Sequence, residues 1–295
     1  MKYRDAASFR HALERRLKEH ASGDGARLAR DRKRVAFDRL LARLTAVAAD
    51  RWLLKGGFAL DLRLTERARA TKDVDLDWCD AEDEFLDTLL DAAEHDSGDF
   101  FGFRVERAGT PADHLGGSCR YRVSTSLAGR QFETFLLDVA FRTSRTEVID
   151  LLTTPDLLAF AGLAPVTVPA IPLETPVAEK LHAYTRTYEG DRPSSRTKDL
   201  VDLVLITELA ALDATTLRSA ITTTFTARGM HPVPDALPAP PKDWGVTFGE
   251  LARAVGIPTG LAAAHAVAAD LLDPVLSGEI DIGTWDNKIR EWTRE

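Results

Sequence analysis

Hydrophobic positions in the first fifty residues recur at the spacing of helices. A helical pattern begins near Asp5 and is interrupted at residues 22–25, where two glycines occur. A second helical pattern follows, and its apolar positions should form one buried stripe. Those positions are Val35, Phe37, Leu40, Leu41, Leu44 and Val47. The pattern therefore predicts two N-terminal helices separated by a short turn.

The next hundred residues mix strand and helix patterns. A short apolar run at 52–54 ends in Lys55-Gly56-Gly57, and a helical pattern resumes at residues 58–64. Residues 73–78 alternate aspartate with apolar side chains, as expected for a strand. Further strands are predicted at 101–105, 119–126 and 132–141, the last two joined by a hairpin connection at 127–130. A helix is predicted at 81–93, with Phe85, Leu86, Leu89 and Leu90 facing inward.

The pattern changes near residue 150. Prolines space out an extended segment at 166–176, which indicates an edge strand or a linker because proline cannot donate to a central ladder. Helices are predicted at 174–188, 197–209, 215–228 and from 244 to the end, with breaks at 256–260 and 273–274. The sequence therefore predicts an α/β (α+β) fold. Residues 1–150 would hold N-terminal helices and a core with a small mixed sheet, and residues 151–295 a mainly helical domain that completes the active-site cleft.

Composition limits the class of protein. A chain of 295 residues with 44% hydrophobic and 28% charged residues is an ordinary globular composition of about two domains. Two cysteines, Cys79 and Cys119, supply neither a disulfide framework nor a four-ligand zinc site. No apolar run is long enough to span a membrane, and the charged start lacks a secretory signal. We expect a cytoplasmic protein with no membrane contact.

Charge is distributed unevenly along the chain. The formal net charge is −8, yet residues 1–43 hold 13 Lys and Arg against 6 Asp and Glu, a balance of +7. The rest of the chain therefore carries −15. A basic segment on an acidic body is typical of a protein that binds a polyanion, and a solvated helix face rich in arginine is the alternative.

The aspartates at 73–77 are candidates for metal binding. Alternation places them on one face of a strand, where like charges repel unless a cation or hydrogen bonds compensate. Mg²⁺ prefers carboxylate oxygens and substrate phosphates, so Asp73 and Asp75 are candidate ligands. The alternative is a solvated acidic edge strand.

Two other segments fit the same chemistry. Gly56 and Gly57 lie between a strand and a helix start, where backbone N–H groups can approach phosphate and Lys55 can add positive charge. Asp138 interrupts the apolar run 135–141, so it needs a partner in or near the interior. It would complete a set of three carboxylates that can hold metal ions beside a triphosphate.

Four motifs in order resemble the AbiEii/AbiGii-type nucleotidyltransferase toxins (MenT-like), members of the DNA polymerase β-like superfamily. They span residues 55–60, 69–76, 178–183 and 196–203. The resemblance covers roughly residues 53–205, and it implies a nucleotidyltransferase-like N-terminal half. The mycobacterial MenT-type enzymes attach nucleotides to the 3′ acceptor end of tRNA and thereby block aminoacylation.

The resemblance also implies roles for particular residues. Asp73, Asp75 and Asp138 would be both catalytic and metal-binding, and Gly56 and Gly57 would hold the triphosphate. Many superfamily members have Gly-Ser here, so Gly57 removes a hydroxyl and leaves phosphate binding to backbone N–H groups and Lys55. Lys180 and Asp202 match positions important for activity. The remaining candidates for nucleotide binding are Arg69, Lys72 and Arg196.

Lys180 and Asp202 also stand out without the resemblance. Each interrupts an apolar helical stripe, and each would be costly to bury alone. We expect them to face a common cleft or each other, and a buried ion pair between two helices is the structural alternative. His182 is expected to be structural, and Asp77 and Asp199 are expected to be bystanders or to support the ligands.

The function implied is transfer of NMP from an NTP to the 3′ end of tRNA, with two Mg²⁺ ions as cofactors and Mn²⁺ as a substitute. The expected partners are the tRNA acceptor end, the NTP and a separately encoded antitoxin. One alternative keeps the chemistry and changes the acceptor to a protein or a small molecule. Another is an NTP-binding sensor without turnover. Motifs of serine hydrolases, zinc proteases and P-loop proteins do not occur.

Overall fold

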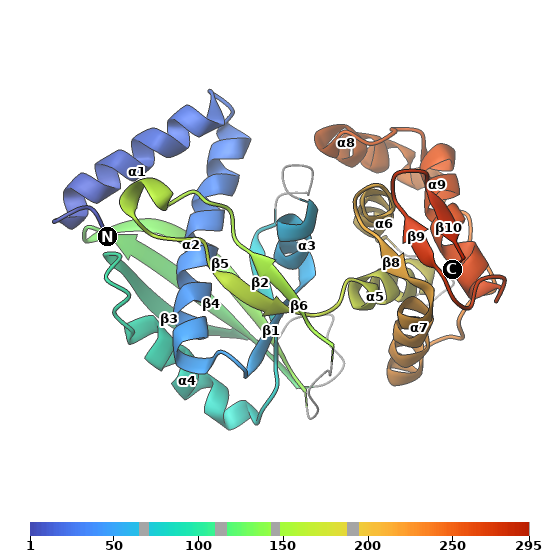
Figure 1. Cartoon of the computed structure of the whole chain (residues 1–295), viewed down its shortest axis with the longest axis horizontal. Coiled ribbons are helices and arrows are strands. Elements are labelled where there is room, and N and C mark those ends of the chain that lie inside the picture. Colours follow the sequence, from blue (N-terminus) through green and yellow to red (C-terminus); the bar gives the residue numbers. More distant parts are fainter. Residues whose placement is uncertain (65–70, 110–116, 143–147, 188–194, 295) are drawn as a thin grey trace. The chain divides into compact units, whose positions relative to one another are not determined.

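The computed structural model describes residues 1–64, 71–109, 117–142, 148–187 and 195–294 (Figure 1). The chain divides into two compact units, Met1–Leu62 with Ala70–Ile171, and Arg63–Arg69 with Pro172–Glu295. The first contains a mixed sheet covered by helices, and the second is mainly helical, so the α/β class predicted from the sequence is confirmed. The division lies after Ile171 rather than near residue 150, because two further strands extend the first unit's sheet.

The sheet of the first unit has seven strands in the order β3-β4-β5-β2-β1-β7-β6. The pairs β2–β5 and β1–β7 are parallel and the others antiparallel. The extended segment predicted at 166–176 contains β7, next to the edge strand β6. The bounds are β1 Trp52–Lys55, β2 Asp73–Trp78, β3 Phe101–Gly109, β4 Ser118–Leu127, β5 Arg130–Phe141, β6 Asp150–Thr153 and β7 Thr167–Ala170.

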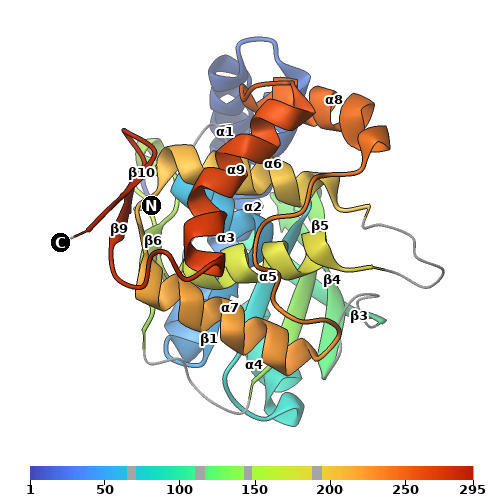
Figure 2. The ribbon, with the colours of Figure 1, turned by 90° about the vertical axis from the view of Figure 1, so that its right-hand side faces the viewer.

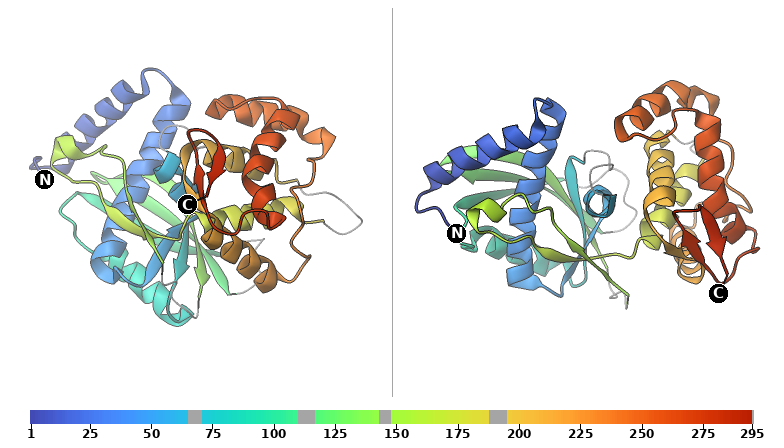
Figure 3. Two further views of the ribbon diagram at one scale, coloured as in Figure 1. Left: turned by 45° about the vertical axis from the view of Figure 1, so that its right-hand side comes forward. Right: turned by 45° about the horizontal axis from the view of Figure 1, so that its top comes forward.

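Four α-helices belong to this sheet. The aspartate caps Asp5 and Asp24 accept backbone N–H groups at the starts of α1 and α2, so the predicted break between these helices is confirmed. Helix α2 packs against α1, α4 and β5, which places its apolar stripe on the sheet (Figure 3). The bounds are α1 Ala6–Ala21, α2 Gly25–Ala48, α3 Gly56–Leu64 and α4 Glu82–Glu94, with a 3₁₀ turn η2 at Ala159–Ala161.

The predicted buried faces of α2 and α4 are largely correct. The stripe of α2 is buried from Val35 to Leu44, but Val47 is exposed because it lies in the last turn, near the end of the helix. On α4, Phe85 and Leu89 are buried, whereas Leu86 and Leu90 are exposed. This helix therefore buries a narrower stripe than the two adjacent pairs of positions, 85–86 and 89–90, would need.

The basic N-terminal segment is engaged within its own unit. Ten of its 13 Lys and Arg side chains contact a carboxylate, a carbonyl, a histidine or an aromatic ring. Arg10 donates to the carbonyls of Leu127, Arg130 and Gln131, and Arg32 to that of Phe132. These arginines hold the N-terminal helices on the sheet, so the +7 balance is not by itself a polyanion-binding surface.

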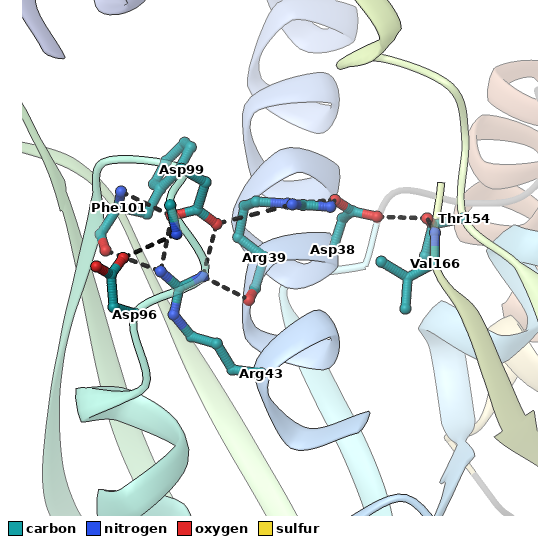
Figure 4. A network of polar contacts seen from close by, with 9 residues as sticks. Asp38, Arg39, Arg43, Asp96, Asp99, Phe101, Thr154 and Val166 are labelled. Atoms are coloured by element: carbon teal, nitrogen blue, oxygen red, sulfur yellow. Dashed lines mark hydrogen bonds and ion pairs between the residues drawn. The ribbon is translucent and has the colours of Figure 1, made fainter. Parts of the chain in front are cut away.

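A buried chain of charges ties α2 to two loops (Figure 4). Arg43 binds both carboxylate oxygens of Asp99 at 2.7 Å, and the two side chains are 1% and 0% exposed. Arg39 contacts Asp99 at 3.7 Å and Asp38 at 2.7 Å, and Asp38 accepts the hydroxyl of Thr154. Burial raises the pKa of Asp38, and Arg39 opposes that effect. Each buried charge therefore has an opposite partner, as burial requires.

The second unit is built from five helices and a small sheet, with α5 packed on α6 and α7, and α6 on α8 and α9 (Figure 2). The helix predicted at the end of the chain is wrong: β9 and β10 form a hairpin there, and Trp285 of β9 is buried. Helix α9 also continues past the break predicted at 273–274: Pro274 lies in its last turn, although proline removes one backbone hydrogen bond there. The bounds are α5 Glu174–Thr185, α6 Thr197–Leu209, β8 Leu212–Asp213, α7 Ala214–Arg228, η3 Lys242–Trp244, α8 Gly245–Val255, α9 Leu261–Leu276, β9 Thr284–Asp286 and β10 Glu291–Thr293.

In the part of the chain that the structure describes, every helix is too short or too polar to cross a lipid bilayer.

Candidate functional site

The sheet brings together the three carboxylates predicted to act as one set. Strand β2 lies between β1 and β5, so its residues have neighbours on both sides. In the register, Asp75 lies opposite Lys55 on β1 and opposite Asp138 on β5. Asp73 is two residues along β2 and therefore on the same face as Asp75. Neighbouring strands are about 4.8 Å apart, so these side chains are close neighbours.

The double glycine lies against the central aspartate. Gly56 begins α3 with φ +63°, and a Cβ there would lie 2.0 Å from Oδ2 of Asp75. Only glycine fits both the backbone conformation and the contact. The N–H of Gly57 donates to the carboxylate of Asp75. The turn predicted to receive phosphate thus also holds the carboxylate predicted to receive metal.

The pKa of the Asp75 carboxyl is strongly perturbed. Removal from water raises its pKa to about 7, and the charges of Asp73 and Asp138 add to this increase. Lys55 and the N–H of Gly57 act in the opposite direction. Asp75 is therefore short of positive charge, and a nearby cation would favour its ionised form.

Asp138 is held by a residue that sequence reasoning missed. Nε and Nη2 of Arg120, on β4, donate to the two oxygens of Asp138, both at 2.6 Å. The Asp138 side chain is 7% exposed and that of Arg120 is 31% exposed. Donation to Asp138 raises the pKa of Arg120, and the charges of Asp138, Asp73 and Asp75 contribute. The guanidinium therefore contacts Asp138 and is also influenced by the charges of the other two carboxylates.

Asp77 is not a bystander, since it determines where Lys55 lies. The fully buried Asp77 contacts Nζ of Lys55 at 2.6 Å and also pairs with Arg142. Lys55 is itself only 9% exposed. Its first contact is thus a carboxylate of the sheet, although it remains close enough to influence Asp75.

The residues present fit a divalent cation in kind. Asp73, Asp75 and Asp138 offer the hard oxygen donors that Mg²⁺ takes, and the charges of Asp73 and Asp138 add to the effect of burial on the pKa of Asp75. The three side chains do not form a complete metal-binding group, however. Among the described residues, no three Asp, Glu, His or Cys side chains are grouped as a metal ion requires, and Asp138 is bound to Arg120.

Lys180 and Asp202 pair with each other in the second unit. Nζ of Lys180, on α5, donates to Asp202 at 2.7 Å and to Asp199 at 3.3 Å, both on α6. The Lys180 side chain is 16% exposed, and that of Asp202 is 5% exposed. The two residues therefore face each other, which matches both the expectation and its structural alternative, a buried ion pair between two helices. Asp199, expected to be a bystander or a supporting group, is a second acceptor for the same ammonium.

The remaining candidates are placed as follows. Lys72 is exposed just before β2, and Arg196 is half-buried at the N-terminus of α6. Arg69 lies outside the described residues. His182 is buried against Phe225 and His231, and this burial lowers its pKa to about 4, so it is neutral and structural.

Arg120 and Arg142 carried one weak signal in the sequence. Arg120 alternates with apolar residues on β4, which marked its face but not its partner. The partner depends on the register of the β4–β5 hairpin, which includes an irregularity between Thr125 and Ser126. Arg142 directly follows β5, and only the tertiary structure shows that it contacts Asp77.

The chain is similar to known nucleotidyltransferases in sequence and in fold. Residues 39–263 match the family model described as nucleotidyl transferase AbiEii toxin of type IV toxin–antitoxin systems. The nucleotidyltransferase toxin MenT4 from Mycobacterium tuberculosis has a similar fold, with a TM-score of 0.58 and 20% sequence identity over 90% of this chain and 89% of that one. JHP933 from Helicobacter pylori matches with a TM-score of 0.46 and 15% identity, over 84% and 94% of the two chains. No curated protein matches the chain.

The family match covers most of the chain, from the middle of α2 into α9, and so includes both units. It contains the carboxylates of β2 and β5, the double glycine, and the pair formed by Lys180 and Asp202. The chain belongs to the AbiEii family of nucleotidyltransferase toxins.

Proposed function

We propose that this toxin transfers NMP from an NTP to the 3′ acceptor end of tRNA in a Mg²⁺-dependent reaction, which would block aminoacylation and translation. One observation carries the proposal: Asp73, Asp75 and Asp138 are neighbours on β2 and β5 beside the double glycine that begins α3. The tRNA acceptor is carried over from the likeness to MenT-type enzymes. A separately encoded antitoxin is implied by the family.

In the reaction, the RNA 3′ hydroxyl attacks the α-phosphorus. A new P–O bond forms, the bond to the bridging α–β oxygen breaks, pyrophosphate leaves, and the hydroxyl proton is lost to water. Bound Mg²⁺, on Asp73 and Asp75 with Asp138 as third carboxylate, would supply charge stabilisation for the attacking and leaving oxygens.

The chain's own residues would position the nucleotide. The start of α3 presents backbone N–H groups beside Asp75, which is favourable for a triphosphate. Lys55 and Arg142 keep Asp77 compensated, so that the strand holds its other aspartates at fixed positions. Lys180, Asp202, Lys72, Arg69 and Arg196 are proposed to contribute to activity on the basis of the family motifs.

The test offers each α-labelled NTP separately, with Mg²⁺ and total tRNA, to the purified full chain. We expect label at the RNA 3′ end, and loss of incorporation in Asp73→Asn with unchanged folding. Asp87→Asn, an exposed aspartate on α4, is the matched control. Label on protein or a small molecule would change the acceptor, and NTP binding without pyrophosphate release would indicate a sensor.

A further inference from the structure

The most unusual contact in the carboxylate region is the one between Asp138 and Arg120. Two hydrogen bonds of 2.6 Å bind the guanidinium to both oxygens of a carboxylate that is 7% exposed. Such a two-pronged pair is strong and geometrically specific. It also uses both oxygen atoms of the carboxylate predicted to be the third metal ligand.

The aspartates of this region and the cations that contact them have a small negative formal charge in sum. Four aspartates lie on the neighbouring strands β2 and β5, and three cations among the described residues contact two of them, Asp77 and Asp138. Lys55 and Arg142 contact Asp77, which is fully buried. Arg120 contacts Asp138. With every aspartate ionised, as a bound cation would favour, the formal sum is −1 when all three cations are in place. It becomes −2, the charge that one divalent cation neutralises, when the guanidinium leaves Asp138.

Arg120 has room to leave Asp138, because its side chain is 31% exposed. Lys55 is only 9% exposed; Arg142 is 35% exposed, but its partner Asp77 is fully buried, whereas Asp138 is 7% exposed. Breaking either contact of Asp77 would remove one of the two cations on a fully buried carboxylate, which is destabilising. Asp138 differs, because an incoming cation would replace the charge that Arg120 withdraws.

We infer that Arg120 is an internal counter-ion that competes with the divalent cation for Asp138 and so sets the cation affinity of the site. This inference depends on the proposed function, because it presupposes cation binding at these carboxylates. Arg120 is thus a positioning residue, which acts through Asp138. The guanidinium of Arg120 occupies both oxygens of Asp138 until a cation displaces it.

The experiment measures cation binding directly, without nucleotide or tRNA. Mn²⁺ is titrated into the metal-free full chain, and free Mn²⁺ is followed by electron paramagnetic resonance. Arg120→Gln should bind Mn²⁺ more tightly by about tenfold, because one positive charge is removed from a partly exposed site. Its melting temperature without metal should fall, and Mn²⁺ should raise that temperature by more than in wild type.

Two controls separate competition from a general charge effect. Arg122→Gln removes the same charge from an exposed position two residues along β4, and should change the affinity less than Arg120→Gln. In an Asp138→Asn background, Arg120→Gln should give no gain, because the contested carboxylate is gone. If Arg120→Gln does not fold, Arg120→Lys, which keeps the charge but not the paired hydrogen bonds, should bind Mn²⁺ more tightly than wild type.

The outcomes separate this inference from the function beneath it. Equal or weaker Mn²⁺ binding by Arg120→Gln, or by Arg120→Lys where that variant is used, with clear binding by wild type, overturns the inference and leaves the proposed metal site intact. A gain that persists in the Asp138→Asn background, or an equal gain from Arg122→Gln, also overturns it. Absence of binding by every variant overturns the inference together with the proposed metal site.

Discussion

Nζ of Lys55 lies 2.6 Å from a carboxylate oxygen of Asp77, on neighbouring antiparallel strands. Asp77 is fully buried and Lys55 is 9% exposed, so each charge depends on its partners in the sheet. A lysine beside a double glycine suggests phosphate binding, and the sequence led to that expectation. In the structure, its first role is to compensate Asp77.

We therefore predict that Lys55→Met is destabilising, by about 3 kcal/mol in the free energy of unfolding, because it removes one of the two cations on a buried carboxylate. Urea unfolding followed by circular dichroism measures this. Lys72→Met, an exposed lysine nearby, should change stability by less than about 0.5 kcal/mol. An equally stable Lys55→Met protein with a raised KM for NTP would instead assign Lys55 to phosphate.

The pKa of Asp75 predicts a pH dependence of stability. Its value of about 7 in the folded chain exceeds the ordinary 3.8, so the folded state holds this proton more tightly than the unfolded state does. Its contribution to the free energy of unfolding is thus full below about pH 4, falls as the pH rises to about 7, and is constant above that.

Asp75→Asn has no such proton, which provides the measurement. In metal-free buffer, wild type should lose stability relative to Asp75→Asn as the pH rises from about 4 to about 7. Urea titrations at several pH values across that interval give the two curves. Parallel curves would show that Asp75 titrates at its ordinary pKa.

Asp138 and its partner Arg120 show how much of this site could be predicted from the sequence. Alternation on β2 and one Asp in an apolar strand were enough to predict that Asp75 and Asp138 belong together, because both patterns are local. The partner of Asp138 is different. The β4–β5 pairing skips Phe132 near Ser126, and an unbroken register would place Arg120 opposite Leu137. A single-residue bulge thus decides which side chain meets Asp138, and no local pattern predicts it.

The same distinction holds for the rest of the fold. Strand and helix patterns with a strong period, such as α2 and β2, were predicted with their buried faces nearly correct. The C-terminal hairpin was not, because β9 and β10 are three residues each and their pairing is defined by tertiary contacts of Trp285 and Trp292. The contacts of the N-terminal arginines also depend on carbonyls a hundred or more residues away.

Gly56→Ala should be among the most damaging small substitutions in the first unit. It combines a left-handed backbone with a Cβ placed 2.0 Å from Asp75. We expect a loss of more than about 2 kcal/mol in stability and loss of nucleotide incorporation, since Asp75 must move. Gly129→Ala is the matched control, with φ +69° and nothing within 4 Å, so it has the backbone strain alone, about 1 kcal/mol. Equal losses of stability for the two variants would mean that the Asp75 side chain can move away from the new Cβ at no cost.

Lys180 and Asp202 allow a structural role to be separated from a functional one within the second unit. The ammonium of Lys180 donates to Asp202 at 2.7 Å and to Asp199 at 3.3 Å. Lys180→Met should lower stability by about 2 kcal/mol, because a hydrogen bond to a charged group is lost. In combination with Asp202→Leu the losses should not add, and their coupling should be about 1 kcal/mol or more.

Lys180→Arg then distinguishes the two roles. Arginine keeps the charge and reaches the same carboxylates, so folding should be retained in thermal melts. If the ammonium also acts in the reaction, labelled-nucleotide incorporation should still fall by about a hundredfold, since a guanidinium does not reproduce the position of a point charge. Full incorporation by Lys180→Arg, with Lys180→Met impaired only in proportion to its lost stability, would restrict this pair to holding α5 against α6.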